Sequence, residues 1–151
     1  MKQKKTRGIV KEKKEKVLTS LNDFGVRLHD QMCRRQFPWI KMPSRSTNNI
    51  LYDDKSRQYV LGIRNVKRSA RNIRHLRPLT QLVWTASFAD ELSHQNKTST
   101  LRDVFYSAQA YEMSFVDQPE SDNIITDLET VIGSPREDFN IFPEERSAIF
   151  G

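Results

Sequence analysis

The sequence predicts a mainly helical α+β fold. Four segments, at about residues 11–35, 78–94, 100–112 and 121–132, repeat apolar residues at the spacing of a helix that lies against a core. Two short runs rich in aliphatic and aromatic residues, 50–52 and 58–61, flank a polar stretch and predict a β-hairpin. With 151 residues, the chain can hold one modest domain plus tails.

Residues 1–36 predict a basic arm followed by a helix. Only Glu12 and Glu15 oppose the many cations of residues 1–16, so we expect this stretch to be a solvated arm. The amphipathic helix expected at about 11–35 ends before Pro38, because proline breaks a helix interior. Residues 37–69 then form an extension that contains the β-hairpin.

Residues 70–151 predict a second group of helices. Pro78 suits the first position of a helix that ends near His94. Thr98 or Ser99 can cap the next helix, which we expect to reach about Glu112. Two helices separated by so short a turn are typical of a helix-turn-helix.

The end of the chain predicts one more helix and a small wing. Ser121 can cap the helix at about 121–132, and Gly133 can end it. The strand candidates 139–142 and 148–150 bracket a short turn. A basic linker, three helices and a terminal wing together predict a winged-helix domain over residues 70–151.

The charge of the chain favours a polyanionic partner. The formal net charge is +6 and the isoelectric point is about 9.6. Residues 64–77 contain six cations and no acidic residue, which favours contact with phosphates over a merely solvated face. These cations are Arg64, Lys67, Arg68, Arg71, Arg74 and Arg77, and Lys97 is a further candidate contact just before the third helical segment.

Several classes of site find no support in the sequence. Cys33 is the only cysteine, which excludes an internal disulfide, and the three histidines are scattered without the spacing of metal ligands. The adjacent carboxylates Asp53–Asp54 and Glu144–Glu145 are explained by turns and not by acid–base catalysis. No apolar run approaches the roughly 20 residues that span a bilayer, and we expect no membrane association.

Tyr106 is the strongest candidate for a catalytic residue. At about 100° per residue, a helix through residues 100–112 has a core-facing stripe of Leu101, Val104, Phe105 and Ala108. Tyr106 lies away from this stripe, and Arg102 is its neighbour one turn earlier. A phenol beside a fixed cation can contact a phosphate. Geometry alone also allows the alternative that Tyr106 is an ordinary surface tyrosine.

Five stretches in order resemble the A subunit of topoisomerase VI, the archaeal type IIB DNA topoisomerase, whose family includes the meiotic transesterase that makes recombination breaks. They are Met42–Ile50, Leu61–Gly62, Thr98–Tyr106, Glu120–Glu129 and Arg136–Asp138. The resemblance covers about residues 37–151 and implies a winged-helix domain related to that of CAP.

The resemblance implies a role for two residues. Tyr106 matches the family tyrosine that attacks a DNA phosphodiester, and Arg102 matches the arginine that holds the scissile phosphate. A phenol ionises only near pH 10, roughly, so it must be activated, and a guanidinium stabilises the charge that develops. A covalent tyrosyl intermediate preserves the bond energy for resealing.

The resemblance also implies partners and cofactors. The family works as an A2B2 assembly on double-stranded DNA, in which an ATPase B subunit binds ATP and a Toprim domain of the A subunit binds Mg²⁺. We find no Toprim carboxylates, no metal site and no phosphate-binding Gly-rich loop in this chain. We therefore expect a truncated chain that is inactive alone, either a fragment of a longer subunit or a shortened relative that needs another chain. The expected location is the cytoplasm, at the nucleoid.

Two alternatives remain open. A non-catalytic winged-helix protein would bind a DNA groove and anchor itself on phosphates, and it would keep its function when Tyr106 is replaced by phenylalanine. An RNA-associated basic protein is disfavoured, because the chain lacks clustered stacking aromatics on a sheet.

Overall fold

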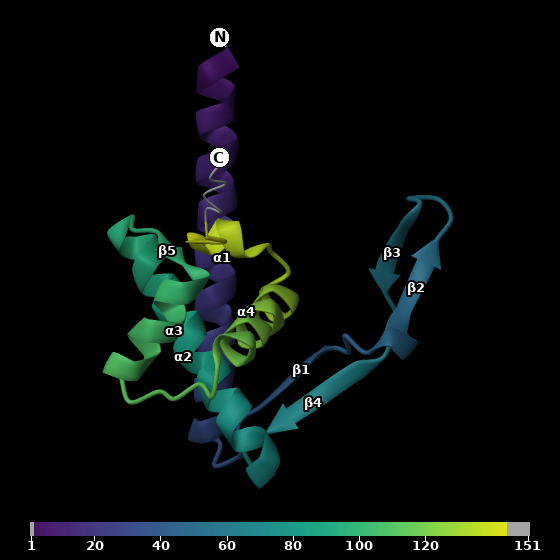
Figure 1. Cartoon of the computed structure of the whole chain (residues 1–151), viewed down its shortest axis with the longest axis vertical. Helices are drawn as coiled ribbons and strands as arrows, with labels where there is room; N and C mark the ends of the chain where they lie inside the picture. The colour runs from purple at the N-terminus through teal and green to yellow at the C-terminus, as the bar shows by residue number, and fades with distance from the viewer. Residues whose placement is uncertain (1, 145–151) are drawn as a thin grey trace, which may run out of the picture.

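A long N-terminal helix, α1 (Lys2–Cys33), runs along the longest axis of the molecule (Figure 1). The computed structural model describes residues 2–144, and side chains from residue 12 onward. The helix begins at Lys2 and not near residue 11, so the backbone of the basic arm was predicted wrongly. Lysine, glutamine and glutamate are good helix formers, and Glu12 can support Lys16 one turn later. Its buried face consists of Val17, Leu21, Phe24 and Leu28.

An antiparallel pair of strands that sequence analysis missed follows this helix. Strand β1 (Trp39–Pro43) pairs with β4 (Asn65–Ser69), with Ile40 opposite Arg68. The predicted hairpin lies between them in the chain, as β2 (Ile50–Asp53) and β3 (Gln58–Leu61), and is confirmed. It projects away from the helices on the far side of β1 and β4 (Figure 1).

Asn49 fixes the point where the hairpin leaves the β1–β4 pair. It ends a short 3-10 helix (Thr47–Asn49) and is only 2% exposed. Its side-chain amide donates to the carbonyls of Ser44 (2.7 Å) and Arg64 (3.1 Å), and its Oδ1 accepts from the Arg64 amide (2.9 Å). A Cβ at Gly62 would lie 2.7 Å from that Oδ1, so only glycine fits there.

Helix α2 (Ile73–Gln95) starts earlier than the sequence predicted. Its N-cap is Asn72, whose side chain accepts a hydrogen bond from the amide of Arg74, and Pro78 lies inside the helix. An asparagine cap satisfies an otherwise unpaired amide, and this outweighs the preference of proline for the first position. The apolar face of α2 supplies Leu79, Leu82, Ala86 and Ala89 to the core.

Helices α3 (Leu101–Ala110) and α4 (Gln118–Ile132) were predicted correctly, but with other caps. Thr100 caps α3 instead of Thr98 or Ser99, and Asp117 caps α4 instead of Ser121, which is fully buried within the helix. Gly133 ends α4 in a left-handed conformation, as expected.

The last described elements include a small pair of parallel strands. A 3-10 helix (Arg136–Phe139) places Phe139 in the core and leads to β6 (Ile141–Phe142). Strand β6 pairs with β5 (Ser99–Thr100), the two residues before α3. The second strand candidate of the wing, 148–150, lies outside the described residues.

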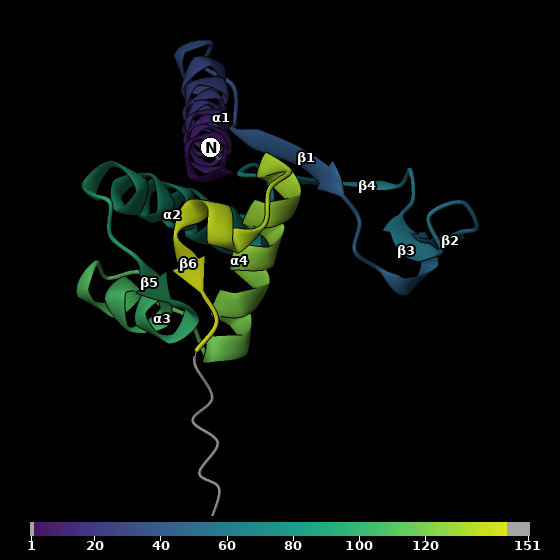
Figure 2. The same ribbon diagram turned by 90° about the horizontal axis from the view of Figure 1, so that it is seen from above.

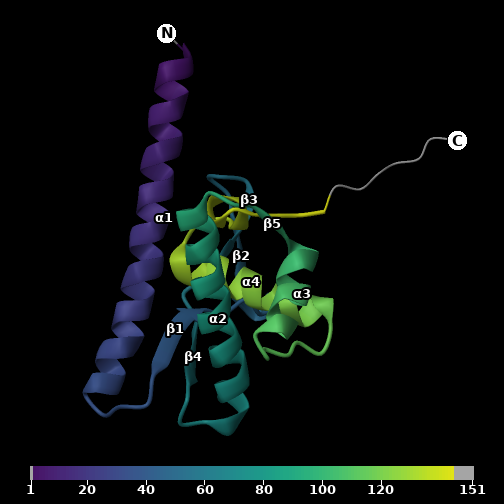
Figure 3. The same cartoon turned by 90° about the vertical axis from the view of Figure 1, so that its left-hand side faces the viewer.

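The helices form a layered body with α2 at its centre. Helix α1 lies on one side of α2, α3 lies on the other, and α4 crosses beside them (Figures 2 and 3). Fully buried side chains at the meeting point include Leu82, Val104, Ile125, Leu128, Phe139 and Ile141. The prediction of a mainly helical α+β fold is confirmed. Within residues 2–144, no helix has the length and apolarity needed to cross a bilayer.

Candidate functional site

The fold holds α3 firmly, and this helix carries Tyr106. At its start the Oγ1 of Thr100 accepts from the amide of Asp103 (3.1 Å), and a carboxylate oxygen of Asp103 accepts from the amide of Thr100 (3.3 Å). This reciprocal capping box pairs two amides that the helix leaves free. On the inner face Val104 and Ala108 are fully buried. The direction of the outer face is therefore fixed.

Tyr106 lies on that outer face, as the helical pattern predicted. Its side chain is 51% exposed, and its ring meets Phe105 edge-on at 5.3 Å between centroids. The guanidinium of Arg102 lies 5.7 Å from the centroid of the Tyr106 ring, which is within the range of a cation–π contact. The structure thus brings the two predicted catalytic residues together on accessible surface.

The pKa of the Arg102 guanidinium is raised above its ordinary value. The largest cause is the nearby Tyr106 hydroxyl, through hydrogen bonding and then charge, and the carboxylate of Glu144 comes next. The contact with Tyr106 is a polar proximity and not an aligned hydrogen bond, since the guanidinium lies over the ring. Arg102 is a permanent cation at this site, because arginine does not deprotonate in proteins.

Glu144 is a neighbour of this pair that sequence analysis did not assign to the site. Its Oε1 lies 4.0 Å from the Nε of Arg102. Together with Asp103 and Phe142 it also borders an open depression at the start of α3. No local sequence signal could have found it, because 42 positions separate it from Arg102 and only the pairing of β5 with β6 brings them close.

The candidate phosphate contacts in residues 64–77 lie apart from Tyr106. They belong to β4, the following turn and the start of α2, which lie apart from α3 in two perpendicular views (Figures 1 and 3). Five of them are exposed: Arg64, Lys67, Arg71, Arg74 and Arg77. The ammonium group of Lys67 lies 4.3 Å from the centroid of the Trp39 ring. Lys97 is exposed on the turn that leads to α3.

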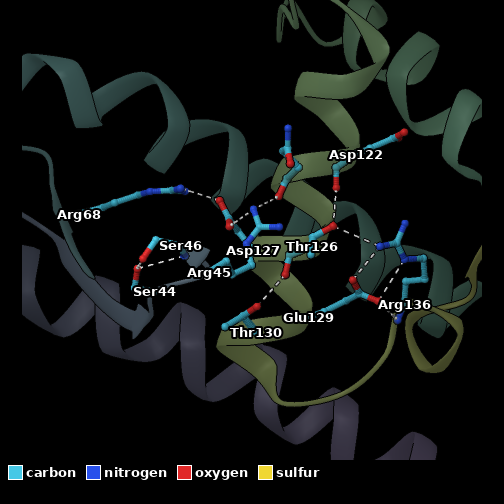
Figure 4. A network of polar contacts seen from close by, with 11 residues as sticks. Ser44, Arg45, Ser46, Arg68, Asp122, Thr126, Asp127, Glu129, Thr130 and Arg136 are labelled. Carbon is cyan, nitrogen blue, oxygen red and sulfur yellow. Dashed lines mark hydrogen bonds and ion pairs between the residues drawn. The ribbon is translucent and has the colours of Figure 1, made fainter. Parts of the chain in front are cut away.

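Arg68 differs from the other cations because it is engaged inside the protein. Its Nη2 lies 2.6 Å from Asp127 Oδ2, while the Nη2 of Arg45 lies 2.7 Å from Asp127 Oδ1 (Figure 4). Asp127 is only 2% exposed. Arg77 is likewise paired, with Glu120 at 3.1 Å. The local count of charges in residues 64–77 missed these counter-charges, which α4 supplies.

The acidic residues of α4 are largely neutralised by cations from other elements. Besides Asp127, Glu129 forms a bidentate pair with Arg136, whose Nε and Nη2 lie 3.0 Å and 2.8 Å from its two oxygens (Figure 4). This bond raises the pKa of Arg136. Within residues 2–144 no group of three or more Asp, Glu, His or Cys side chains has the geometry of a metal site.

Comparison with known proteins identifies related sequences. Residues 77–141 match the family model described as type IIB DNA topoisomerase. The chain is 38% identical over 136 residues to the A subunit of type 2 DNA topoisomerase 6 from Methanothermobacter thermautotrophicus, covering 90% of this chain and 38% of that protein.

Two further relatives bear the same name. The protein from Halobacterium salinarum is 37% identical over 123 residues (80% of this chain, 34% of that protein), and that from Pyrococcus abyssi is 31% identical over 142 residues (91% and 37%). The chain thus spans little more than a third of the length of the curated relatives it matches. The resemblance inferred from the sequence motifs is confirmed: over most of its length, this chain is homologous to the A subunits of the type IIB DNA topoisomerase known as topoisomerase VI.

Proposed function

We propose that this chain is the DNA-cleaving part of the A subunit of a type IIB topoisomerase, with Tyr106 as its nucleophile. The observation that carries the proposal is the outward direction of Tyr106 beside Arg102, on a helix that is capped at its start and buried on its inner face. Both residues lie inside the segment 77–141 that matches the topoisomerase family.

The proposed reaction is a transesterification. The phenol of Tyr106 loses its proton, and its oxygen forms a bond to the phosphorus of a DNA phosphodiester. The bond from phosphorus to the 3′ oxygen breaks, and that oxygen takes up a proton. One phosphate ester replaces another, so the 5′-phosphotyrosyl link can be reversed without an external energy source.

Arg102 would hold the phosphate during this reaction. A guanidinium donates several hydrogen bonds in a fixed plane, which suits phosphate oxygens, and its permanent charge stabilises the transition state. The side chain is 57% exposed and lies one turn from Tyr106, so both can face the same phosphate. Lys97, Arg64, Lys67, Arg71 and Arg74 would anchor the flanking DNA, and Arg68 could do so only after leaving Asp127.

We further propose that residues 70–151 form a winged-helix domain, preceded by the helical region 1–36 and the extension 37–69. The short connection between α2 and α3, and the packing of α4 against both, support this assignment. Helix α3 would be the helix that faces DNA, since its outer side carries both Arg102 and Tyr106.

The complete enzyme would contain components beyond these residues. Mg²⁺ does not fit the described part of the chain, because residues 2–144 offer no suitable ligand cluster, so we assign it to a Toprim domain outside this segment. ATP would be bound by a B subunit in an A2B2 complex in the cytoplasm, at the nucleoid. The projecting hairpin β2–β3 is a candidate surface for B, because Leu51, Tyr52 and Tyr59 are 54%, 54% and 76% exposed.

The substitution Tyr106→Phe tests the proposed nucleophile. In the complete enzyme, with both kinds of subunit, Mg²⁺ and ATP present, we expect unchanged non-covalent DNA binding and complete loss of the protein–DNA adduct that survives denaturation. Tyr111→Phe is the matched control, because Tyr111 follows the same helix, is 60% exposed and should retain the adduct. An adduct that persists in Tyr106→Phe would reject the assignment, and unaltered cellular function would favour a non-catalytic DNA-binding protein.

A further inference from the structure

Strand pairing brings Glu144 beside Arg102. In the parallel pair of β5 and β6, Thr100 is opposite Phe142. Arg102 follows Thr100 by two residues, and Glu144 follows Phe142 by two residues. The strand register therefore places the two side chains close together. Strand β6 is anchored there by the fully buried Ile141 and by the hydrogen bond from the Ser99 amide to the Asn140 carbonyl (2.9 Å).

We propose that Glu144 is a positioning residue that holds Arg102 while the site is free of DNA and that competes with the incoming phosphate for its guanidinium. The inference rests on the proposed function, because it assumes that Arg102 receives the scissile phosphate. The Nε of Arg102 and Oε1 of Glu144 are 4.0 Å apart, and both side chains are about half exposed, at 57% and 44%. The phosphate can therefore reach the same side chain from solvent.

The other carboxylates near Arg102 are not equivalent to Glu144. Asp103 is adjacent in sequence, but its carboxylate accepts from the Thr100 amide in the capping box. Asp122 lies on α4, and its pKa is raised mainly by burial and further by the charge of Glu144. Among residues 2–144, Glu144 is thus the carboxylate that forms an ion pair with Arg102.

A phosphate that binds Arg102 comes close to the carboxylate of Glu144. Two anions cannot both take the closest position at one guanidinium, and like charges a few ångströms apart repel each other. Glu144 must therefore turn away before Arg102 can engage DNA fully. Because the side chain of Glu144 is 44% exposed, it can rotate into solvent and release Arg102 while β6 stays in place.

The test measures non-covalent DNA binding, so that cleavage does not enter the result. In the full-length A subunit carrying Tyr106→Phe, the affinity for a short duplex is measured by fluorescence anisotropy at low salt. We expect Glu144→Gln to tighten binding by roughly two- to fivefold, the size of one surface charge interaction in water. The gain should shrink at high salt, because screening shortens the reach of exposed charges.

Three controls separate competition for Arg102 from other effects. Glu112→Gln removes the same charge from an exposed position just beyond α3 and should change binding less. Glu144→Asp keeps the charge and should bind like the unsubstituted protein. In an Arg102→Ala background, Glu144→Gln should tighten binding no more than Glu112→Gln does, because the double-mutant cycle removes the part of the effect that depends on Arg102. Unchanged thermal midpoints would show that folding is not the cause.

The outcomes also distinguish this inference from the proposed function. Unchanged or weaker binding by Glu144→Gln, or an equal gain in the Arg102→Ala background, would overturn competition while leaving Tyr106 as the nucleophile. Loss of the adduct's dependence on Tyr106 would overturn the proposed function, and absence of DNA binding in every variant would overturn both.

Discussion

The substitution Asp127→Ala should strongly destabilise the attachment of the extension to the helical body. Asp127 lies on α4, accepts a hydrogen bond from Arg45 in the segment after β1, and forms an ion pair with Arg68 in β4 (Figure 4). The N–O distances are 2.7 Å and 2.6 Å, and Asp127 is 2% exposed. Removing this carboxylate leaves both cations without their shared partner.

The size of this destabilisation can be estimated from the burial of Asp127 and the exposure of its two arginine partners. Hydrogen bonds to charged groups contribute about 1.5–3 kcal/mol each, and breaking a buried ion pair costs about 3–5 kcal/mol. The side chains of Arg45 and Arg68 are 34% and 19% exposed, so both can regain some water after the substitution. We therefore expect a loss of about 2–4 kcal/mol in the free energy of unfolding, after discounting for this solvent access.

Urea unfolding followed by circular dichroism measures the global effect, and amide hydrogen exchange locates it. Exchange should accelerate first in residues 39–69, because Arg45 and Arg68 connect this extension to α4. Asp127→Asn keeps the volume and removes the charge, which separates the ion pairs from a cavity effect. Asp23→Ala, on the exposed face of α1, is the control and should change stability by less than about 0.5 kcal/mol. A cost below about 1 kcal/mol for Asp127→Ala, or uniform exchange across the chain, would refute the reasoning.

Two further predictions concern the pKa of Asp122 and the binding of the B subunit by the hairpin. Burial is the largest cause that raises the pKa of Asp122, and Glu144 adds to it while Arg136 opposes it. A folded-state pKa above the ordinary value of 3.8 makes the ionised form costly, so this contribution to stability is highest below pH 3.8 and falls as pH rises through the folded pKa. Asp122→Asn should therefore raise the urea midpoint at pH 7 and lose its advantage by about pH 3; an equal gain at both pH values would contradict this cause. In the hairpin, Tyr59 is 76% exposed and meets Tyr52 edge-on at 5.3 Å. Tyr59→Ser should weaken B-subunit binding, measured by calorimetry, by about tenfold if the hairpin is an anchor of that interface, whereas Gln58→Ser should not, and equal affinities would exclude the hairpin. Deleting residues 1–36 cannot serve this purpose, because α1 supplies Val17, Leu21, Phe24 and Leu28 to the core.

Local sequence patterns were enough to predict the buried side of α3, the β2–β3 hairpin and the end of α4. The period of the apolar residues in 101–108 set the buried side of α3, and with it the outward direction of Tyr106 beside Arg102. The polar turn at 53–57 determined the hairpin, and Gly133 determined the end of α4. Each of these features is specified within a few positions of the chain, so it can be predicted without knowledge of packing.

Helix starts were less predictable because several residues compete for the same role. Pro78 and Asn72 are both plausible near the start of α2, and the capping hydrogen bond from the Arg74 amide decides for Asn72. At α3 the reciprocal bonds between Thr100 and Asp103 prevail over capping by Thr98 or Ser99. Such small differences of free energy are settled by the packing of the completed helix.

Tertiary structure alone decided which charged side chains meet. Arg68 and Asp127 are 59 positions apart, and Arg102 and Glu144 are 42 apart, so no local pattern records either pair. The sequence by itself specified a basic chain in which the phenol of Tyr106 points outward beside the guanidinium of Arg102. The packing of α4 against the β1–β4 pair and the register of β5 with β6 determined which cations remain free for phosphate, because an ion pair forms only where folding brings opposite charges within a few ångströms.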